Sequence, residues 1–276
     1  MPELPEVEVI CRGIRPHLIG HRITAVHHSG KNLRLPVPLS ALQQKLPGCR
    51  IVTVSRRAKY IQITFDTGVM LIIHLGMTGN LGFFSPSTKL AKHDHVQFTL
   101  DNGSQLRFHD VRRFGSIYLI PEQDIAAIES TIFRTTGPEP FSNEFTPQYL
   151  QGKANNKQVS VKVFIMNSQV VAGIGNIYAS ESLFKAGIRP TRKAKALCLK
   201  EWQRLTVEIQ NVLNHAIECG GSTISDFVNA GQKKGYFQIQ FKVYGKQGEN
   251  CSVCGTEIQK VQLGGRASYF CPHCQK

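Results

Sequence analysis

Four of the eight cysteines in this 276-residue chain stand in a pattern that is typical of a metal site. Cys251 and Cys254 form one C-x2-C pair, and sixteen residues separate it from a second pair, Cys271 and Cys274. This spacing folds two knuckles around one tetrahedral Zn²⁺ ion. Because four thiolates leave no open position for water, we expect a structural zinc and look for catalytic chemistry elsewhere. A pair of disulfides is the alternative, but it is typical of secreted chains, and nothing else in the sequence indicates secretion.

The first residues of the chain offer a nucleophile beside two acids, in the order Pro2, Glu3 and Glu6. Once Met1 is removed, Pro2 presents a secondary amine with a pKa of about 8, so a neutral fraction exists at physiological pH. An ordinary helix start explains the same residues, because proline is favoured in the first helical turn and acidic side chains complement the helix dipole. On these residues alone, the helix start is the preferred interpretation.

Two further patterns are weak by themselves. Lys59 follows a pair of arginines just before an expected strand, where basic side chains also discourage strand pairing. Asn176 comes after Gly173 and Gly175 at an expected helix start, where backbone N–H groups and the helix dipole favour a phosphate oxygen. Asparagine is equally an ordinary N-cap residue at such a position. Each position therefore has a structural and a functional interpretation.

The charge balance narrows the class of partner. Lys and Arg total 33 against 19 acidic residues, which gives a net charge of +14 and a pI near 9.6 and indicates either nucleic acid or an anionic membrane. The amphipathic helix expected over residues 199–218 carries too few cations for a membrane-surface protein. No apolar run approaches the roughly 20 residues that span a bilayer, and the first residues lack the pattern of a signal peptide, so we expect a soluble, intracellular protein.

The elements that must position these residues change type along the chain. Apolar residues at helical spacing predict a helix over residues 3–19, and β-branched runs between residues 23 and 120 predict antiparallel strands in a sandwich or a barrel. The predicted strands are residues 51–54, 60–65, 69–75, 96–100, 105–108 and 117–120. Breaker residues around 135–140 indicate a domain boundary, and helices follow it, the clearest over 199–218. The last segment, from about residue 237, is too short for a core of its own and needs the metal.

Several longer motifs accompany the cysteine pairs. They are MPELPE at residues 1–6, RAKY at 57–60, HLGM at 74–77, KHDH at 92–95, RRFG at 112–115 and GIGNIYASE at 173–181. Together they resemble the formamidopyrimidine-DNA glycosylase family, and the resemblance runs from end to end. It implies an α+β multidomain fold: an N-terminal antiparallel β-sandwich with flanking helices, a helix-two-turn-helix domain and a C-terminal zinc-finger β-hairpin. The implied ranges are 1–134 for the catalytic domain, 135–150 for a linker, 151–236 for the helix-two-turn-helix domain and 237–276 for the zinc finger.

Members of that family remove oxidised purines, typically 8-oxoguanine and formamidopyrimidines, from duplex DNA and then cut the abasic strand. The resemblance makes Pro2 the nucleophile that attacks C1′ of the deoxyribose, and Glu3 the group that moves protons during ring opening and elimination. It implies Lys59 as the proton donor for β-elimination and a phosphate contact, and Arg266 as the matching group for δ-elimination. Because a secondary amine gives a cationic iminium, the C2′ proton becomes acidic, and base loss and strand cleavage are linked.

A base inside a duplex cannot reach Pro2, so the nucleotide must be extruded and the gap must be filled. By resemblance, Met77, Arg112 and Phe114 form the wedge that fills it, and Arg112 could hydrogen-bond the orphaned partner base. The DNA-contacting residues that the resemblance implies are Glu6, His74, Met77, His93, Arg112, Phe114, Lys157 and Asn176. The small, polar loop over residues 220–226 corresponds to a lid over the extruded base, and a linker that ends a helix is the alternative.

Two other functions stay open on the sequence. An endonuclease VIII-like glycosylase shares the scaffold and prefers oxidised pyrimidines, but Leu4 and the KHDH motif favour the purine branch. A non-catalytic zinc-ribbon protein would bind DNA without forming a trappable adduct. For the favoured interpretation we expect one structural Zn²⁺, damaged double-stranded DNA as the partner, no membrane, a monomer, and a place in the bacterial cytoplasm in association with the nucleoid.

Overall fold

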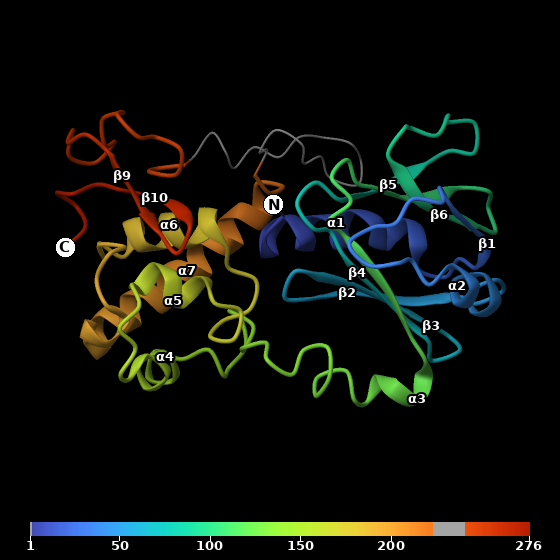
Figure 1. The fold of residues 1–276 in the computed structure, drawn as a ribbon, viewed down its shortest axis with the longest axis horizontal. Coiled ribbons are helices and arrows are strands. Elements are labelled where there is room, and N and C mark those ends of the chain that lie inside the picture. The colour runs from blue at the N-terminus through green and yellow to red at the C-terminus, as the bar shows by residue number, and fades with distance from the viewer. Residues whose placement is uncertain (1, 223–240) are drawn as a thin grey trace. The chain divides into compact units, whose positions relative to one another are not determined.

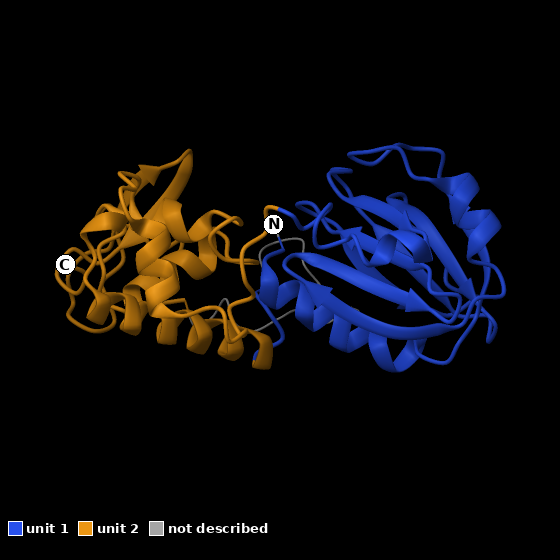
Figure 2. Cartoon of the chain, turned by 90° about the horizontal axis from the view of Figure 1, so that it is seen from below, with its two compact units in different colours: residues 1–134, 219–236 blue, residues 135–218, 237–276 orange. Residues whose placement is uncertain are grey.

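The structure, a computed structural model, describes residues 2–222 and 241–276. The chain divides into two compact units, and each unit is assembled from two stretches of sequence (Figure 2). The first unit comprises residues 1–134 and 219–236, and the second comprises residues 135–218 and 237–276. The chain therefore leaves the first unit after residue 134 and returns to it at residue 219 before it enters the zinc-finger segment.

The first unit begins with a helix and continues mainly as strands. Its elements are α1 Leu4–Leu18, β1 Ile23–His28, α2 Leu39–Lys45, β2 Ile51–Arg57, β3 Tyr60–Phe65, β4 Met70–His74, β5 Asn80–Phe84, β6 Asp94–Leu100, β7 Gln105–His109, β8 Ser116–Ile120 and α3 Glu122–Ile125. α1 buries Val7, Ile10 and Ile14, as the helical spacing of its apolar residues predicts. Gly20 follows the helix with a φ of +89°, a backbone conformation that glycine adopts without strain.

Two four-stranded antiparallel sheets make up most of the first unit, in the orders β1-β6-β7-β5 and β2-β3-β4-β8. Figure 1 shows the unit with β1 to β6 labelled. Every second residue of β3 is buried, because alternate side chains of a strand point to opposite faces. One apolar cluster combines residues from both sheets with residues from α1 and α2. Since two separate sheets enclose one core, the fold is a sandwich, which is one of the two alternatives that the sequence left open.

Two strands were missed by the sequence prediction. β1 buries Ile23 and Val26, three residues apart, because its register with β6 shifts near Ala25 and breaks the alternation. β5 contains Gly82, where a Cβ atom would lie 2.5 Å from the ring of Phe84. Glycine weakens the strand pattern in the sequence, and here it lets the ring of Phe84 lie close against the backbone.

The second unit is helical and ends in a hairpin. Its elements are α4 Pro147–Ala154, α5 Val161–Met166, α6 Asn176–Lys185, the 3-10 helix η1 Ala194–Ala196, α7 Leu199–Glu218, β9 Gln259–Leu263 and β10 Arg266–Phe270. α7 has the predicted bounds, packs against α4 and α6, and buries one stripe that includes Trp202, Leu205 and Ile209. Among the described helices, none is long and apolar enough to cross a lipid bilayer.

The C-terminal hairpin has little apolar material of its own. β9 and β10 pair in antiparallel fashion around a turn in which Gly264 and Gly265 both have positive φ. The buried cluster beneath the finger consists of Phe184, Val243, Cys251, Ile258 and Cys271. Because Phe184 belongs to α6, part of the apolar support of the finger comes from the helical segment.

Candidate nucleic-acid site and metal centre

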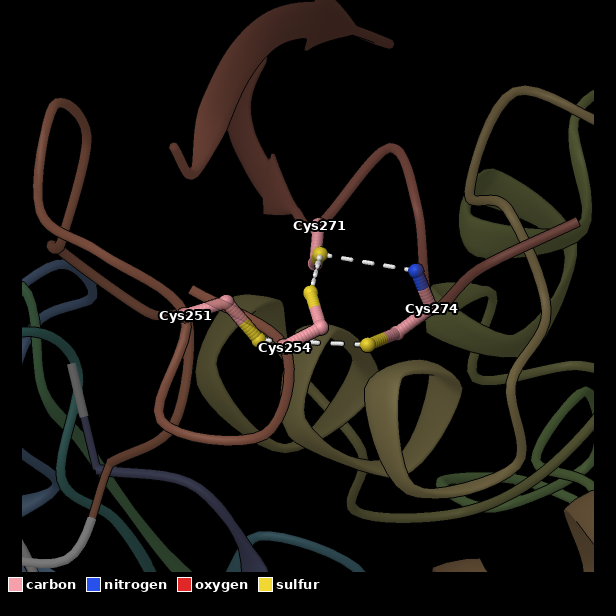
Figure 3. A group of neighbouring side chains, drawn as sticks. All are labelled: Cys251, Cys254, Cys271 and Cys274. Carbon is pink, nitrogen blue, oxygen red and sulfur yellow. Dashed lines mark hydrogen bonds between the residues drawn. The ribbon is translucent and has the colours of Figure 1, made fainter. Parts of the chain in front are cut away.

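The four cysteines of the two C-x2-C pairs converge at the end of the hairpin (Figure 3). Their sulfur atoms all lie within 4.8 Å of one another, with 3.4 Å between Cys254 and Cys271 and 3.9 Å between Cys251 and Cys274. Zinc–sulfur bonds of about 2.3 Å in a tetrahedron separate the sulfurs by about 3.8 Å. The geometry of the cluster therefore fits one Zn²⁺ ion with four thiolate ligands and no open coordination position.

The electrostatics of the cluster also call for a cation. Burial raises the pKa of both Cys271 and Cys274, whereas hydrogen bonds from Thr256 lower the pKa of Cys254 to about 6. Four thiolates this close together repel one another unless a divalent ion lies between them. The zinc would hold the two knuckles and orient the hairpin, and the catalytic groups must come from other residues.

At the N-terminus, Pro2 stands outside the first helix. Glu3 is the N-cap of α1, and Leu4 and Pro5 occupy its first two positions. Pro5 is therefore the proline of the first helical turn, and the helix-start interpretation does not account for Pro2. The backbone N–H of Glu3 donates to Glu6 Oε2 over 2.8 Å in a reciprocal capping box. Pro2 is buried directly beside two buried carboxyl groups.

Glu6 also ties the helix start to a distant segment of the first unit. Its Oε1 accepts hydrogen bonds from the backbone N–H of Ser222 over 2.9 Å and from the Ser222 hydroxyl over 2.8 Å. Ser222 belongs to the loop over residues 220–226 that the sequence assigned to the lid. Residues 223–226 of that loop lie outside the described residues.

Lys59 and His74 lie at one end of the β2-β3-β4-β8 sheet. Lys59 follows Ala58, which has a φ of +53°, in the tight turn between β2 and β3. Where β3 pairs with β4, Tyr60 lies opposite His74, the last residue of β4. Burial, together with the positive charges of Lys59 and Arg34, lowers the pKa of His74 to about 4, so the imidazole is neutral. Its Nδ1 accepts the backbone N–H of Gly76 over 3.2 Å, which leaves the second ring nitrogen to carry the proton.

The three predicted wedge residues lie on two loops that touch each other. Met77 is in the turn after β4, and Arg112 and Phe114 are in the loop between β7 and β8. A Cβ atom on Gly76 would lie 2.4 Å from the backbone carbon of Phe114, so only glycine permits this approach. The guanidinium of Arg112 stacks on the exposed ring of Phe114 at 4.7 Å. The structure therefore brings the wedge residues together at the surface.

His93 lies in a cluster of histidines close to these loops. Its ring meets the His109 ring edge-on at 5.8 Å and the His95 ring at 6.2 Å. Asp94 accepts a hydrogen bond from His109 Nδ1 over 2.9 Å. His93 is half-buried and its neighbour Lys92 is exposed, so the KHDH motif presents polar groups to the surface.

The second unit carries the remaining predicted DNA contacts. Asn176 is the first residue of α6 and Gly175 is its N-cap, so the interpretation of Asn176 as an N-cap was wrong. Gly175 makes no side-chain hydrogen bond at the cap position. The side chain of Asn176 instead accepts a hydrogen bond from Lys162. Lys157 is exposed after α4, and Arg266 is exposed at the first position of β10.

Three segments of the chain match known domain families. Residues 1–117 match the formamidopyrimidine-DNA glycosylase N-terminal domain, residues 136–228 match its H2TH domain, and residues 248–276 match a zinc finger found in FPG and IleRS. A formamidopyrimidine-DNA glycosylase of Legionella pneumophila is 48% identical over 275 residues, which cover 100% of this chain and 98% of the relative. This chain belongs to the formamidopyrimidine-DNA glycosylase family.

Solved structures of relatives agree with this membership. A mutant FPG of Lactococcus lactis in complex with Fapy-dG-containing DNA is similar with a TM-score of 0.91 and 33% identity over 100% of both chains. The Lactococcus lactis Fpg in complex with abasic-site-containing DNA is similar with a TM-score of 0.90 and 33% identity over 99% of both chains. The predictions of the family, the α+β fold and one structural zinc are confirmed, and the chain is a DNA glycosylase of base excision repair.

One residue that organises the second unit of this glycosylase was missed by the sequence reasoning. Lys162, on α5, is fully buried, and its ammonium donates to Asn176 Oδ1 over 2.6 Å, to the Ala267 carbonyl over 3.0 Å and to the Ser268 hydroxyl over 2.7 Å. It therefore joins α5, the start of α6 and β10. A lone lysine inside the apolar run Val161–Met166 was the available signal, because charged side chains are rarely buried without such partners.

Proposed function

We propose that this glycosylase is also an abasic-site lyase, and that it excises oxidised purines from duplex DNA through a covalent bond to Pro2. The observation that carries the proposal is the position of Pro2, which stands ahead of the N-cap of α1 beside the buried carboxyl groups of Glu3 and Glu6. The main chain of Pro2 is not needed for the helix, so its nitrogen is available for chemistry once Met1 is removed.

The first step joins enzyme and sugar. The neutral amine of Pro2 forms a bond to C1′ while the bond between C1′ and the base breaks, and the base leaves with the bonding electrons and takes up a proton. Glu3 then gives a proton to O4′ as the bond between C1′ and O4′ opens, and the Pro2 nitrogen, which has lost its proton, forms the C1′ iminium.

The second step cleaves the strand. The iminium withdraws electrons and acidifies the C2′ proton, which the Glu3 carboxylate left by the first step takes up while the 3′ phosphate leaves with its bonding electrons in a β-elimination. Lys59 is proposed to donate a proton to that leaving group, and Arg266 to contact the 5′ phosphate that departs in the δ-elimination. Zinc would contribute only the rigid hairpin that carries Arg266.

The DNA contacts proposed from the sequence divide between the units. The first unit supplies Glu6, His74, His93 and the wedge of Met77, Arg112 and Phe114, and the second supplies Lys157 and Asn176. The contact between the two wedge loops supports a single insertion into the gap left by the extruded nucleotide. The exposed side chain of Lys157 and the helix start at Asn176 suit phosphate oxygens. The enzyme is proposed to act as a monomer on the bacterial chromosome.

Borohydride trapping tests the covalent step, because it reduces the iminium to a stable amine. The substrate is a duplex with one 8-oxoguanine opposite cytosine, and the proteins are the wild type, Pro2→Gly, a form with one extra N-terminal residue, and Pro5→Ala as a matched control in the same segment. We expect a trapped adduct and strand cleavage with the wild type and with Pro5→Ala. The extended form should bind DNA without forming the adduct.

The same assay separates the alternatives. An adduct that forms with an oxidised pyrimidine but not with 8-oxoguanine would indicate an endonuclease VIII-like specificity. Trapping of the N-terminally extended form at the wild-type level would assign the nucleophile to another amine. Binding without any adduct, on either lesion or on a plain abasic site, would reject the lyase and favour a protein that only binds DNA.

A further inference from the structure

Asp110, just after β7, is a fully buried acid that lies between the two wedge loops. Its Oδ1 accepts a hydrogen bond from the Thr78 hydroxyl over 2.6 Å, and its Oδ2 accepts the backbone N–H of Gly115 over 2.8 Å. Thr78 follows Met77 in the first loop, and Gly115 follows Phe114 in the second. One carboxyl group therefore fixes the residue next to each of two wedge side chains.

The Thr78 hydroxyl completes the link, because it accepts as well as donates. Its oxygen accepts the backbone N–H of Arg112 over 3.0 Å while its proton goes to Asp110. A hydroxyl can hold both bonds at once, whereas a methyl group of the same size can hold neither. The hydrogen bonds that run from Asp110 through Thr78 thus extend to Arg112, the third wedge residue.

The backbone of Asp110 anchors this link to the β-sheet. Its N–H donates to the carbonyl of His93 over 3.0 Å, and its carbonyl accepts from the ring of His95 and from the N–H of Arg113 over 3.0 Å and 3.3 Å. Its carboxyl group bonds to neutral donors and does not draw the neighbouring arginines inward, since the side chains of Arg112 and Arg113 are exposed. The positive charges of Arg112 and Arg113 therefore stay at the surface, above the hydrogen bonds that hold Asp110.

We propose that Asp110 and Thr78 are positioning residues that lock the loops of Met77 and of Arg112 and Phe114 into one insertion element, which opens the duplex before the chemistry begins. This inference rests on the proposed role of the three wedge residues. It predicts that the hydroxyl of Thr78 matters for the extrusion of a stacked base and much less for a nucleotide that has no base to extrude, because unstacking is then not required.

The test compares Thr78→Val, which keeps the shape and removes both hydrogen bonds, with Thr78→Ser, which keeps the hydroxyl. Single-turnover excision of 8-oxoguanine from a duplex is measured beside cleavage of a preformed abasic site. We expect Thr78→Val to slow excision by about tenfold or more, as the loss of a buried hydrogen-bonding group implies, with abasic-site cleavage within about twofold of the wild type. Thr78→Ser should restore excision, and Thr88→Val, at an exposed threonine of another loop, should behave as wild type.

Duplex opening is read separately by the fluorescence of 2-aminopurine placed next to the lesion, which needs no catalysis. Thr78→Val should reduce the fluorescence rise on binding, and Asp110→Ala, which removes both carboxylate acceptors and leaves the buried Gly115 N–H unpaired, should reduce it further. Equal losses of excision and of abasic-site cleavage, or an unchanged fluorescence rise with Thr78→Val, would overturn the inference. If the wild type opens the duplex but forms no trapped adduct, the proposed lyase function fails while the positioning role stands.

Discussion

The sandwich and the zinc finger both carry loops that we propose to contact DNA, but they support those loops in different ways. In the first unit, one apolar core shared by both sheets, α1 and α2 lies beneath the loops that carry Met77 and Phe114. Under the finger the apolar cluster is small and includes Phe184 from α6, so the hairpin depends on the cysteine cluster and on buried polar groups. A large core tolerates the loss of a single contact better than a metal-held hairpin does.

In each unit, a fully buried charged residue joins segments that lie apart in the chain: Asp110 in the first unit and Lys162 in the second. Asp110 accepts hydrogen bonds from two loops that already rest on the sandwich core. Lys162 donates to groups on α6 and on β10, and its bond to Ser268 spans 106 positions of sequence. The apolar cluster under the hairpin is small, so few other contacts hold β10 against the helices. Lys162 should therefore contribute more to the stability of the second unit than Asp110 contributes to that of the sandwich. The following experiments test this difference, in order of decreasing expected effect.

Zinc removal should have the largest effect, and this effect should be confined to the second unit. Binding of Zn²⁺ by four thiolates contributes on the order of 10 kcal/mol to such fingers, so chelation or Cys254→Ser should unfold the hairpin and abolish DNA binding. The only tryptophan, Trp202, is buried in α7 and reports on the second unit by fluorescence. Hydrogen exchange of the sandwich strands should stay at the wild-type level.

The matched control is Cys198→Ser, at an exposed cysteine outside the cluster. It should retain one zinc ion per chain and full DNA binding. Loss of sandwich protection on chelation would contradict the independence of the two cores.

Replacing Lys162 with methionine should have the next largest effect. The substitution leaves three buried neutral acceptors, on Asn176, Ala267 and Ser268, without their donor, at a cost of about 3 kcal/mol. The midpoint of urea unfolding, followed by Trp202 fluorescence, should fall. Lys195→Met, at an exposed lysine of the same unit, should leave it unchanged. If both variants unfold at the wild-type midpoint, the buried ammonium is not what joins α5, α6 and β10.

His74 should make the first unit sensitive to acid. Its pKa is about 4 in the folded state against 6.5 for the free group, so the unfolded chain binds more protons between these values. Stability is therefore complete above pH 6.5 and falls as the pH drops toward 4, by up to about 3 kcal/mol. His74→Gln should flatten the dependence of the unfolding free energy on pH in this window.

The measurement is denaturant-induced unfolding of the first unit at several pH values between 4 and 7, with hydrogen exchange as the readout. His27→Gln, at an exposed histidine of the same unit, is the control and should keep the wild-type slope. An unchanged slope with His74→Gln would show that other groups cause the acid sensitivity.

The ion pair between Arg192 and Glu201 should have the smallest effect. The hydrogen bond from the Arg192 guanidinium lowers the pKa of Glu201 to about 2, so this contribution is present above pH 4.5 and is lost as the pH falls toward 2. The pair is partly exposed, so Glu201→Gln should cost only about 1 kcal/mol at neutral pH. The difference in Trp202 unfolding midpoint between wild type and variant should shrink at pH 3, and a constant difference would contradict the assignment.

The sequence predicted best those features that depend on residues close together in the chain. The cysteine pairs identify the zinc site because the spacing within each knuckle is set by local geometry. α7 was predicted with its observed bounds because one apolar stripe runs along its whole length and glycines follow it. The short helices α4 and α5 were missed, since eight and six residues hold too little periodicity to stand out.

Only the tertiary structure decided which distant groups meet. Asp110 and Lys162 are buried beside polar partners that separate segments of the chain bring to them. The first turn of α1 at Pro5 and the N-cap of α6 at Gly175 are local features, which residue type alone did not place. The sequence by itself determined the family and the metal ligands, because these depend on residue type and local spacing. The positions of buried charges were left to the fold, because a charge is buried only where segments far apart in the chain bring it hydrogen-bond partners.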